Sequence, residues 1–308
     1  MSDPVSETSP AETTADVDKD EPIIRVRDLV KIFGTQTVLD GINLDIDPGE
    51  IMVIMGGSGC GKSTFLRHMI GSLKPNEGTV EVLGTEITNI PERELNEVRK
   101  KIGILFQSGA LFNSMTLRQN VALPMEEHTD LNRETIDIMV TIKLELMGLR
   151  EHGEKYPSQI SGGMKKRAGL ARALALDPKI LFYDEPSAGL DPVTSAEIDQ
   201  LMIKLSRQLG VTSVVVTHEM DSAFTIADRM AMLDKGRMLM VDRREEFERL
   251  RDSDSDDLTR DQQLIRQFLR GAPDGPITER KKTSGYADEL LGTDAGRLVA
   301  RPSVQATR

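Results

Sequence analysis

The residues best suited to chemistry form a glycine-rich run that ends in a lysine and a serine. Glycine lets the backbone turn tightly and direct successive N–H groups at phosphate oxygens, and a helix that begins at the lysine adds its partial positive charge. Lys62 is then expected to reach the β- and γ-phosphates of a nucleotide, and the Ser63 hydroxyl to bind Mg²⁺. The expected nucleotide-binding residues of this segment are Gly56, Gly57, Ser58, Gly59, Cys60, Gly61, Lys62, Ser63 and Thr64.

The flanking residues favour a phosphate-binding loop over a chance glycine-rich turn. Ile51–Met55 is a continuous apolar run that predicts a buried strand, and Phe65, Leu66 and Met69 have the spacing of one helix face. Strand, glycine-rich loop and helix in this order are the context that the motif requires. Cys60 occupies a variable position of the loop and is interpreted as a small filler; the alternative is a redox role.

Two adjacent carboxylates, Asp184 and Glu185, end a second apolar run. Asp184 is expected to hold Mg²⁺ through a water molecule, and Glu185 to orient and polarise an attacking water as general base. By itself, an acidic pair at a strand end belongs to a solvated turn about as often as to a catalytic site. Because the same chain carries a phosphate-binding loop, we interpret the pair as part of a nucleotide-hydrolysing site.

The distance between these two motifs leaves room for an inserted subdomain, because Asp184 lies 122 positions after Lys62. Ser161, Gly162 and Gly163 lie near the end of this interval and precede a basic stretch. A serine hydroxyl and backbone N–H groups at a helix N-terminus are suited to a γ-phosphate. A Ser-Gly-Gly turn by itself is usually structural, so its meaning depends on the other motifs.

The order of these motifs resembles that of the ABC ATPases, over about residues 23–248. The family signature usually reads Leu-Ser-Gly-Gly-Gln, and here Ile160 and Met164 replace its first and last residues. The resemblance implies that Gln107 contacts Mg²⁺ and the attacking water. It also implies that Asp191 is the aspartate of the D-loop, and that His218 is a switch residue that contacts the γ-phosphate and supports the general base.

Phe33 resembles the aromatic residue that stacks on adenine in this family, with a role in the core as the alternative. The implied catalytic residues are Glu185, His218 and Gln107. The implied metal-binding residues are Ser63, Gln107 and Asp184. The residues that join the glycine-rich loop in binding ATP are Phe33, Ser161, Gly162, Gly163 and Asp191.

The resemblance also implies an assembly, because in this family the signature of one subunit closes on the phosphate-binding loop of another. A homodimer would therefore hold two ATP molecules head to tail. Closure would expel water around the γ-phosphate and couple hydrolysis to a domain motion. The apolar runs are far shorter than the roughly 20 residues that span a bilayer. A separate integral membrane permease is therefore expected, contacted through the groove beside Gln107.

The sequence after Gln107 is similar to that of MCE-associated, Mla-type lipid transport ATPases, in residues 106–112, 120–124 and 127–129. A C-terminal stretch, 264–277, adds to the similarity, although it could be a plain surface helix and tail. The similarity implies a phospholipid or related hydrophobic substrate, an MCE-domain protein and a small STAS-domain protein as partners. The alternatives are an ABC ATPase for a small polar solute, or a soluble, non-transport ABC protein, which normally carries two cassettes or a long coiled coil.

The hydrophobic pattern predicts the elements that position these residues. Short strands in 24–46 and 78–87, with turns at Asp40-Gly41 and 47–49, predict a small β lobe. Residues 115–149 are predicted to be largely helical, with breaks near Pro124 and at 126–132. Later apolar runs separated by helical patterns predict a parallel sheet. With the resemblance, the fold class is α/β: a P-loop NTPase of ABC ATPase fold with a RecA-like parallel-sheet core, an antiparallel β lobe and an inserted α-helical subdomain.

Composition suggests how the chain is divided and where it works. Residues 1–22 are predicted to be a disordered acidic tail, 23–249 the ATPase domain with its helical subdomain at about 108–175, and 250–308 an extension that is partly helical and then flexible. The net charge of −11 argues against nucleic acid as a partner. The single cysteine excludes an internal disulfide, and from the acidic residues at the start of the sequence no secretory signal is expected. The expected location is peripheral, on the cytoplasmic side of the inner membrane.

Overall fold

The computed structural model describes residues 21–255 and 257–278, which divide into two compact units between Phe247 and Glu248. Residues 1–20 and 279–308, which hold most of the predicted acidic tail and the predicted flexible end, lie outside the described ranges. Within those ranges, no helix combines the length and the apolar character needed to cross a membrane.

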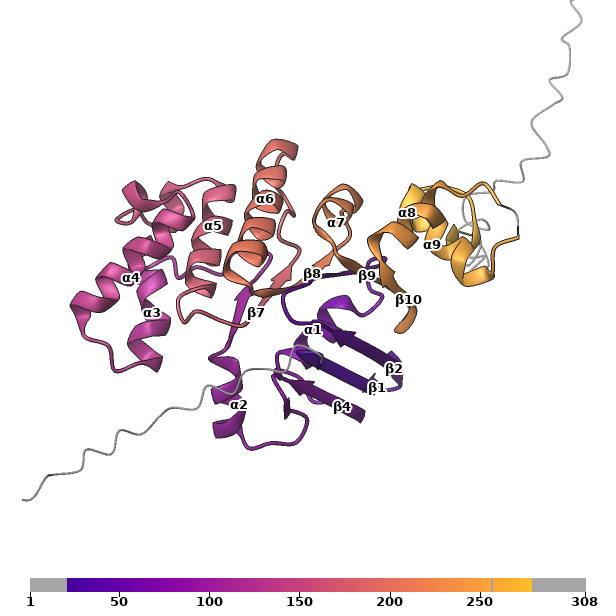
Figure 1. The fold of residues 1–308 in the computed structure, drawn as a ribbon, viewed down its shortest axis with the longest axis horizontal. Coiled ribbons are helices and arrows are strands. Elements are labelled where there is room, and N and C mark those ends of the chain that lie inside the picture. The colour runs from indigo at the N-terminus through magenta and orange to yellow at the C-terminus, as the bar shows by residue number, and fades with distance from the viewer. Residues whose placement is uncertain (1–20, 256, 279–308) are drawn as a thin grey trace, which may run out of the picture. The chain divides into compact units, whose positions relative to one another are not determined.

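A six-stranded sheet with the order β10-β9-β3-β8-β7-β6 forms the centre of the first unit (Figure 1). Neighbouring strands run parallel, except that β10 is antiparallel to β9. Every residue of β3 and β8 is buried, as expected for parallel strands covered on both faces. The strands are β3 Ile51–Met55, β6 Ile102–Leu105, β7 Ile180–Asp184, β8 Thr212–Thr217, β9 Arg229–Asp234 and β10 Arg237–Arg243.

An antiparallel sheet with the order β2-β1-β4-β5 forms the predicted β lobe. The turn predicted at Asp40-Gly41 is wrong, because both residues lie inside β2. There the register with β1 slips between the pairs Leu29↔Ile42 and Lys31↔Leu39, and Gly41 takes up the irregularity with a φ of 66°. The strands are β1 Ile24–Phe33, β2 Gln36–Ile46, β4 Glu77–Val82 and β5 Thr85–Glu86.

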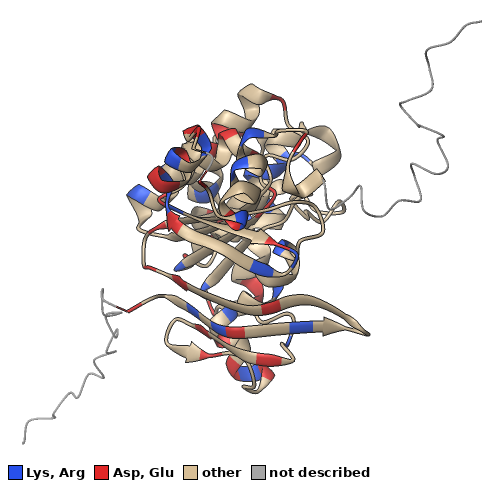
Figure 2. Ribbon diagram, turned by 90° about the vertical axis from the view of Figure 1, so that its right-hand side faces the viewer, with Lys and Arg blue, Asp and Glu red and all other residues tan. Residues whose placement is uncertain are grey.

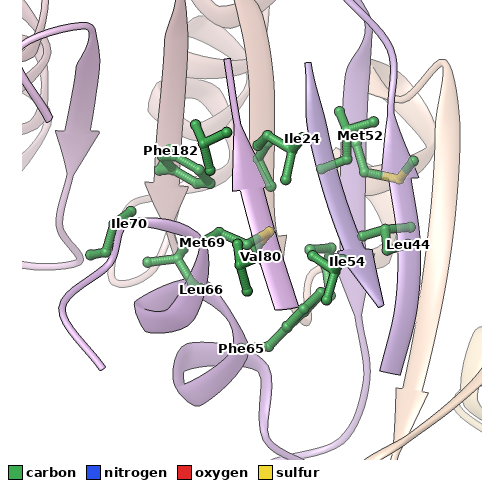
Figure 3. Close-up of a cluster of buried hydrophobic side chains, with 14 of the residues drawn as sticks. Ile24, Leu44, Met52, Ile54, Phe65, Leu66, Met69, Ile70, Val80 and Phe182 are labelled. Carbon is green, nitrogen blue, oxygen red and sulfur yellow. The ribbon is translucent and has the colours of Figure 1, made fainter. Parts of the chain in front are cut away.

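Helix α1 (Lys62–Met69) packs in a hydrophobic core to which both sheets contribute (Figure 3). Phe65 and Met69 are fully buried there, together with Ile24 from β1 and Phe182 from β7. Burying an aromatic or aliphatic side chain of this size stabilises the fold by about 1.5–3 kcal/mol. The core therefore anchors the helix whose N-terminus carries the glycine-rich loop.

Three helices that follow β6 lie together as a group within the first unit (Figure 1). Side chains cap each of them: Thr116 with Gln119 forms a capping box, and Asn132 and Ser161 each accept a bond from the first turn. The break predicted near Pro124 is wrong, because Pro124 lies inside α3. Proline has no backbone N–H, so the helix lacks one hydrogen bond at this position. Packing of α3 against α4 and α5 stabilises the helix despite this loss. The helices are α3 Leu117–His128, α4 Arg133–Leu146 and α5 Gly162–Ala173, with short 3₁₀ turns at Arg150–His152 and Pro157–Gln159.

Four more helices within the described residues precede or follow strands of the central sheet. The sequence analysis did not anticipate α2 or the hairpin strand β10. Lys and Arg are interspersed with Asp and Glu over the ribbon, as Figure 2 shows. The helices are α2 Glu92–Arg99, α6 Pro192–Leu209, α7 Met220–Ile226 and α8 Arg244–Asp252. With its parallel-sheet core, antiparallel lobe and inserted helices, the molecule confirms the predicted fold class.

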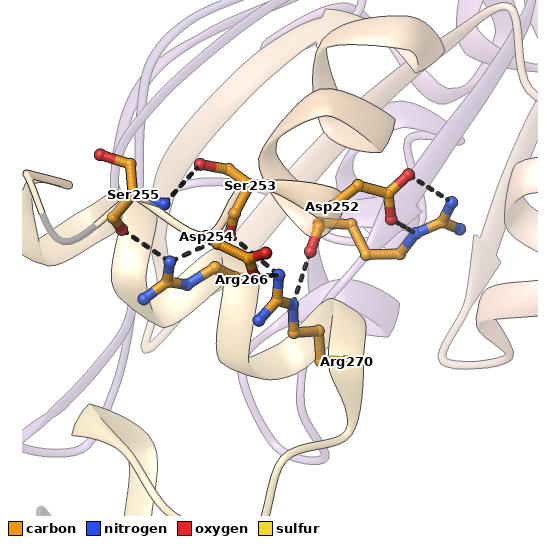
Figure 4. A network of polar contacts seen from close by, with 7 residues as sticks. Asp252, Ser253, Asp254, Ser255, Arg266 and Arg270 are labelled. Carbon is orange, nitrogen blue, oxygen red and sulfur yellow. Dashed lines mark hydrogen bonds and ion pairs between the residues drawn. The ribbon is translucent and has the colours of Figure 1, made fainter.

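The second unit contains helix α9 (Arg260–Arg270), which begins with a capping box between Thr259 and Gln262 and ends at Gly271 with a φ of 60°. Two arginines of α9 bind the main chain before it (Figure 4). Arg266 donates to the carbonyl oxygens of Ser253 and Ser255 at 3.1 and 2.8 Å, and Arg270 donates to Ser253 O at 2.9 Å. These bonds order the serine- and aspartate-rich segment that precedes α9.

Candidate active site

The glycine-rich loop joins the end of β3 to the start of α1. Gly56 has a φ of 154°, and a Cβ at this position would lie 2.1 Å from the carbonyl oxygen of Leu233. Gly61 has a φ of 111°, and its Cβ would lie 2.9 Å from the Leu39 side chain. Real Cβ atoms do not approach other atoms so closely, so both positions require glycine for the loop to pack against the sheet.

The side chain of Lys62 lies over this loop. It is buried, and its Nζ donates to the carbonyl oxygens of Gly56 and Gly57 at 2.7 and 3.1 Å. An ammonium has three donors, so Lys62 can bind a phosphate oxygen and keep a bond to the loop. Cys60, also in the loop, is 6% exposed, and burial raises the pKa of its thiol. A raised thiol pKa opposes formation of the reactive thiolate and favours the small-filler interpretation over the redox alternative.

Ser63 and Asp184 meet at the carboxyl edge of the central sheet. The Ser63 hydroxyl lies 3.4 Å from Oδ1 of Asp184. Burial, followed by the negative charge of Glu185, raises the pKa of Asp184 above its ordinary value. Hydroxyl and carboxylate oxygens are the hard ligands that Mg²⁺ accepts, and Mg²⁺ usually keeps several waters and phosphate oxygens as further ligands. The pair fits such an ion, whose charge would also favour the ionised form of Asp184.

Glu185 and His218 form the second pair of this edge. His218 Nδ1 lies 2.9 Å from Glu185 Oε2, a bond that the imidazole donates because a carboxylate only accepts. The His218 side chain is 58% exposed, whereas that of Glu185 is 14% exposed. Glu185 also has a φ of 49°, which is uncommon for a residue other than glycine and is typical of functional sites. An exposed imidazole that holds a shielded carboxylate suits the orientation of a water molecule.

Gln107 lies two residues beyond the end of β6, and it is exposed. Strand β6 pairs in parallel with β7, with Leu105 opposite Tyr183, so Gln107 follows its strand at the same sheet edge as Asp184 follows Tyr183. Phe33, at the end of β1, is 49% exposed, and Lys31 Nζ lies 5.1 Å from its ring centroid. Such exposure excludes the alternative of a core role for Phe33.

The Ser-Gly-Gly segment begins helix α5. Ser161 is exposed and is the N-cap, and its Oγ accepts a bond from Met164 N at 3.3 Å. Gly162 is exposed, whereas Gly163 packs so closely on Thr194 that a Cβ would lie 2.5 Å from that side chain.

Asp191 has a structural role that the sequence analysis did not assign to it. It is the N-cap of α6, and its Oδ1 accepts from Val193 N and Thr194 N, each at 3.1 Å. The hydrogen bond from the Thr194 hydroxyl, at 2.6 Å, contributes most to lowering the pKa of Asp191.

The sequence analysis assigned no role to two basic residues of α5. Lys166 is 4% exposed, and its Nζ donates to the carbonyl oxygen of Glu185 at 3.0 Å. Arg172 donates to Ala110 O at 2.7 Å and to Gly109 O at 3.1 Å, just after Gln107. The basic stretch after the signature was visible in the sequence, but nothing in it indicates which cation is buried or what it contacts.

A cavity of about 870 Å³ lies beside the segment that contains Gln107. Side chains of α2, β6, α3, α5 and the segments that follow α2 and β6 line it. They are apolar, basic and acidic, among them Phe106, Phe112, Leu123, Lys100, Arg172, Glu97 and Glu127. Phe106 and Phe112 are 41% and 51% exposed, and the Arg172 guanidinium lies 6.0 Å from the Phe112 ring centroid. The cavity therefore offers apolar surface with an excess of basic over acidic side chains at its lining, although Lys100 is paired with Glu97 at 2.9 Å.

The chain is similar to known proteins that bind ATP, as the geometry of the site leads one to expect. The family model of ABC transporters matches residues 39–188. The probable ribonucleotide transport ATP-binding protein mkl of Mycobacterium leprae is 43% identical over 90% of this chain and 77% of its own length. The intermembrane phospholipid transport system ATP-binding protein MlaF of Haemophilus influenzae is 38% identical over 87% of this chain and 98% of its own, and that of Escherichia coli K12 is 37% identical over 87% and 96%.

Solved structures give the same result. The dimeric, post-hydrolysis state of the ATP-binding cassette MJ0796, bound to ADP and Pi, superposes with a TM-score of 0.67 at 32% identity, over 71% of this chain and 98% of that one. The ABC transporter subunit cbiO1 of Clostridium perfringens superposes with a TM-score of 0.69 at 31% identity, over 74% and 90% of the two chains.

Proposed function

The chain belongs to the ATP-binding subunits of ABC transporters, and from this premise we propose that it hydrolyses MgATP in a head-to-tail homodimer to move phospholipid, or a related hydrophobic molecule, through a separate permease. The observation that carries the catalytic part is the juxtaposition of two pairs at one sheet edge. Ser63 and Asp184 lie 3.4 Å apart, and the next residue, Glu185, lies 2.9 Å from His218.

The loop and Lys62 bind the phosphates of ATP in this proposal. The N–H groups at the N-terminus of α1 and the Lys62 ammonium supply positive charge where charge develops on the γ-phosphate. Ser63, Asp184 and Gln107 would hold Mg²⁺, which would supply positive charge against the phosphates of ATP. Phe33 offers an exposed ring on which adenine stacks.

Glu185 acts as general base in this proposal. Its carboxylate polarises the attacking water, and the bond from His218 fixes the direction of the carboxylate. The water oxygen bonds to the γ-phosphorus while the bond from that phosphorus to the oxygen that remains on ADP breaks, which gives ADP and phosphate. Ser161, Gly162 and Gly163 of the second copy donate hydrogen bonds to the γ-phosphate from the opposite side. Each copy therefore contributes half of each site, and the exposure of Ser161 and Gly162 supports this arrangement.

The cavity beside Gln107 is the proposed contact for the permease. Its exposed Phe106 and Phe112 would bury the apolar face of a short cytoplasmic helix, and Lys100 and Arg172 would attract acidic residues of that helix. Arg172 lines the cavity and binds the carbonyl oxygens of Gly109 and Ala110. A displacement of Arg172 by the permease would therefore move the segment that follows Gln107.

The similarity to MlaF of two organisms, which is named for phospholipid transport, supports phospholipid as the substrate. An MCE-domain protein and a small STAS-domain protein are proposed as further partners. The name of the mycobacterial relative favours a second candidate, a ribonucleotide, which is a small polar solute. In either case the proposed location is peripheral, at the cytoplasmic side of the inner membrane.

Purification of the tagged full chain with its membrane partners, followed by mass spectrometry, separates the two candidates. Recovery of a permease with an MCE-domain protein is expected, together with ATPase activity that responds to phospholipid vesicles. Recovery of a permease with a periplasmic solute-binding protein, with ATPase activity that responds to ribonucleotides, would overturn the lipid proposal and leave the ATPase mechanism intact.

A further inference from the structure

The backbone of Glu185 is held in a conformation that its neighbours do not favour. Its φ of 49° lies in the left-handed region, and the next residue is Pro186, which restricts the preceding residue to extended conformations. Surrounding contacts must therefore maintain this geometry. The direction of the Glu185 side chain depends on it, because φ sets where the Cα–Cβ bond points.

Several contacts of Glu185 come from β8 and its end. Its N–H donates to Val216 O in β8 at 2.9 Å, and its carboxylate accepts from His218, which follows the same strand. These bonds fix the N–H and the tip of the side chain, but they do not fix the peptide group between Glu185 and Pro186.

That peptide group is held from α5. Lys166 Nζ donates to Glu185 O at 3.0 Å, and Ala188 N donates to the same oxygen at 3.3 Å in the turn that follows. Burial is the larger influence on Lys166 and lowers its pKa, while the carboxylates of Glu185, Asp184 and Glu219 favour its charged form. A buried ammonium is costly unless it is compensated, so its contact with this carbonyl is a specific feature of the packing.

We propose that Lys166 is a positioning residue for hydrolysis, which fixes the Glu185–Pro186 peptide so that the Glu185 carboxylate faces His218 and the attacking water. The proposal rests on the role of Glu185 as general base given above. It also links the two half-sites within one chain, because α5 begins at Ser161 and so carries both the signature and the lysine that holds the catalytic backbone.

A second buried lysine provides a matched control. Lys143 of α4 is 7% exposed and pairs with Asp177, which lies in the connection from α5 to β7 and precedes that strand rather than following it. Replacing either lysine by methionine removes a buried ammonium and keeps most of the volume. The two variants therefore share the general cost of the change and differ in the contact with Glu185.

The test compares kcat, the KM for ATP, the affinity for a non-hydrolysable ATP analogue and the thermal midpoint in Lys166→Met, Lys166→Arg and Lys143→Met. Lys166→Met is expected to lower kcat by about tenfold to a hundredfold, the effect of a small misplacement of a reacting group, with KM and affinity within about twofold of wild type. Lys166→Arg keeps N–H donors and is expected to retain about a third of kcat or more. Lys143→Met is expected to lower only the midpoint.

Three outcomes separate the possible failures. Wild-type kcat in folded Lys166→Met, or a loss of kcat that Lys143→Met matches at an equal midpoint, overturns the positioning role. If Lys166→Met does not fold, Lys166→Ala gives the same test, because alanine also lacks the donor and is a strong helix former. Glu185→Gln measured in parallel isolates the premise: retained turnover there refutes the general base, whatever Lys166 does.

Discussion

The chain presents backbone N–H groups at a helix N-terminus in two glycine-containing segments, residues 56–63 and 161–163, but it supports them differently. In the first, a Cβ at Gly56 would lie 2.1 Å from a main-chain oxygen, and Lys62 is buried against the loop. In the second, Gly163 is also packed closely, on Thr194, but a Cβ at Gly162 would have its nearest contact at 3.5 Å, an ordinary van der Waals distance, and Ser161 is exposed.

This difference separates what the fold of one chain requires from what an assembly requires. The glycine at position 56 is needed for the loop to pack within its own molecule. The glycine at 162 is not needed by its own packing, so the absence of a side chain there leaves room for something outside the chain. This asymmetry supports the proposal that the signature serves the nucleotide of a second copy.

Glu185→Gln is expected to have the largest effect on turnover. It also tests whether the two segments, from different copies, close on one nucleotide. Turnover should fall by about 10²- to 10⁴-fold, because the amide cannot take a proton from water. ATP binding should remain, so that MgATP traps a closed dimer, detected as a doubling of mass by light scattering. Glu94→Gln, at an exposed carboxylate of α2, serves as control and should retain turnover. A Glu185→Gln protein that stays monomeric with ATP bound would contradict the shared site.

Gly56→Ala and Gly162→Ala test the comparison directly. Strain at a φ of 154° and the clash with Leu233 O should destabilise Gly56→Ala by about 3 kcal/mol and impair nucleotide binding. Gly162→Ala should change the unfolding free energy by about 0.5 kcal/mol or less, yet lower turnover at least about tenfold. Urea unfolding and phosphate release measure the two effects. Equal destabilisation of both variants would show that the signature glycine serves its own fold.

Lys62→Ala is expected to act on binding in the free monomer. A hydrogen bond to a charged group contributes about 1.5–3 kcal/mol, so the Kd for ATP should rise about tenfold to a hundredfold. Lys204→Ala, which removes an exposed lysine of α6, should leave the Kd unchanged. Equilibrium binding of a fluorescent ATP analogue gives both values. An unchanged Kd in Lys62→Ala would remove the lysine from the phosphate site.

The sequence allowed the fold class and the candidate residues at the sheet edge to be predicted, because their signals are local. A buried strand, a glycine-rich loop and an amphipathic helix follow one another at 51–69, and Asp184 and Glu185 directly end an apolar run. The parallel pairing of these strands then places the residues at one edge. Ser161 and His218 could be assigned to the candidate site only from the motif spacing and the family resemblance, because a lone serine or histidine does not indicate such a role.

The features that could not be predicted from the sequence depend on contacts between segments that are distant in the chain. Lys166 stands among other basic residues in the sequence, and its contact with Glu185 arises only when α5 packs beside β6, so that the lysine reaches the residue that follows β7. Pro124 normally predicts a helix break, but tertiary packing of α3 overrides that local preference. Gly41 resembles a turn residue and instead lies in a bulge within β2, because the register with β1 is set by the whole strand pair.

The smallest expected effect comes from two helix caps that differ in their surroundings. Thr116 and Ser161 are both N-caps, but Thr116 is 9% exposed and forms a full capping box with Gln119, whereas Ser161 makes one bond of 3.3 Å at the surface. Loss of a cap costs about 1 kcal/mol, so Thr116→Ala and Ser161→Ala should lower the unfolding free energy by that amount or less.

Their turnover should nevertheless diverge. Per folded molecule, Thr116→Ala should hydrolyse ATP at the wild-type rate, and Ser161→Ala should be slower with unchanged ATP affinity in the monomer, because its hydroxyl serves the partner's nucleotide. Mixing Ser161→Ala with Lys62→Ala sharpens this result. In the head-to-tail arrangement one site of the heterodimer carries both substitutions and the other carries neither, so the mixture should recover part of the turnover that each variant lacks alone. No recovery on mixing would place Ser161 and Lys62 at the same nucleotide of one chain.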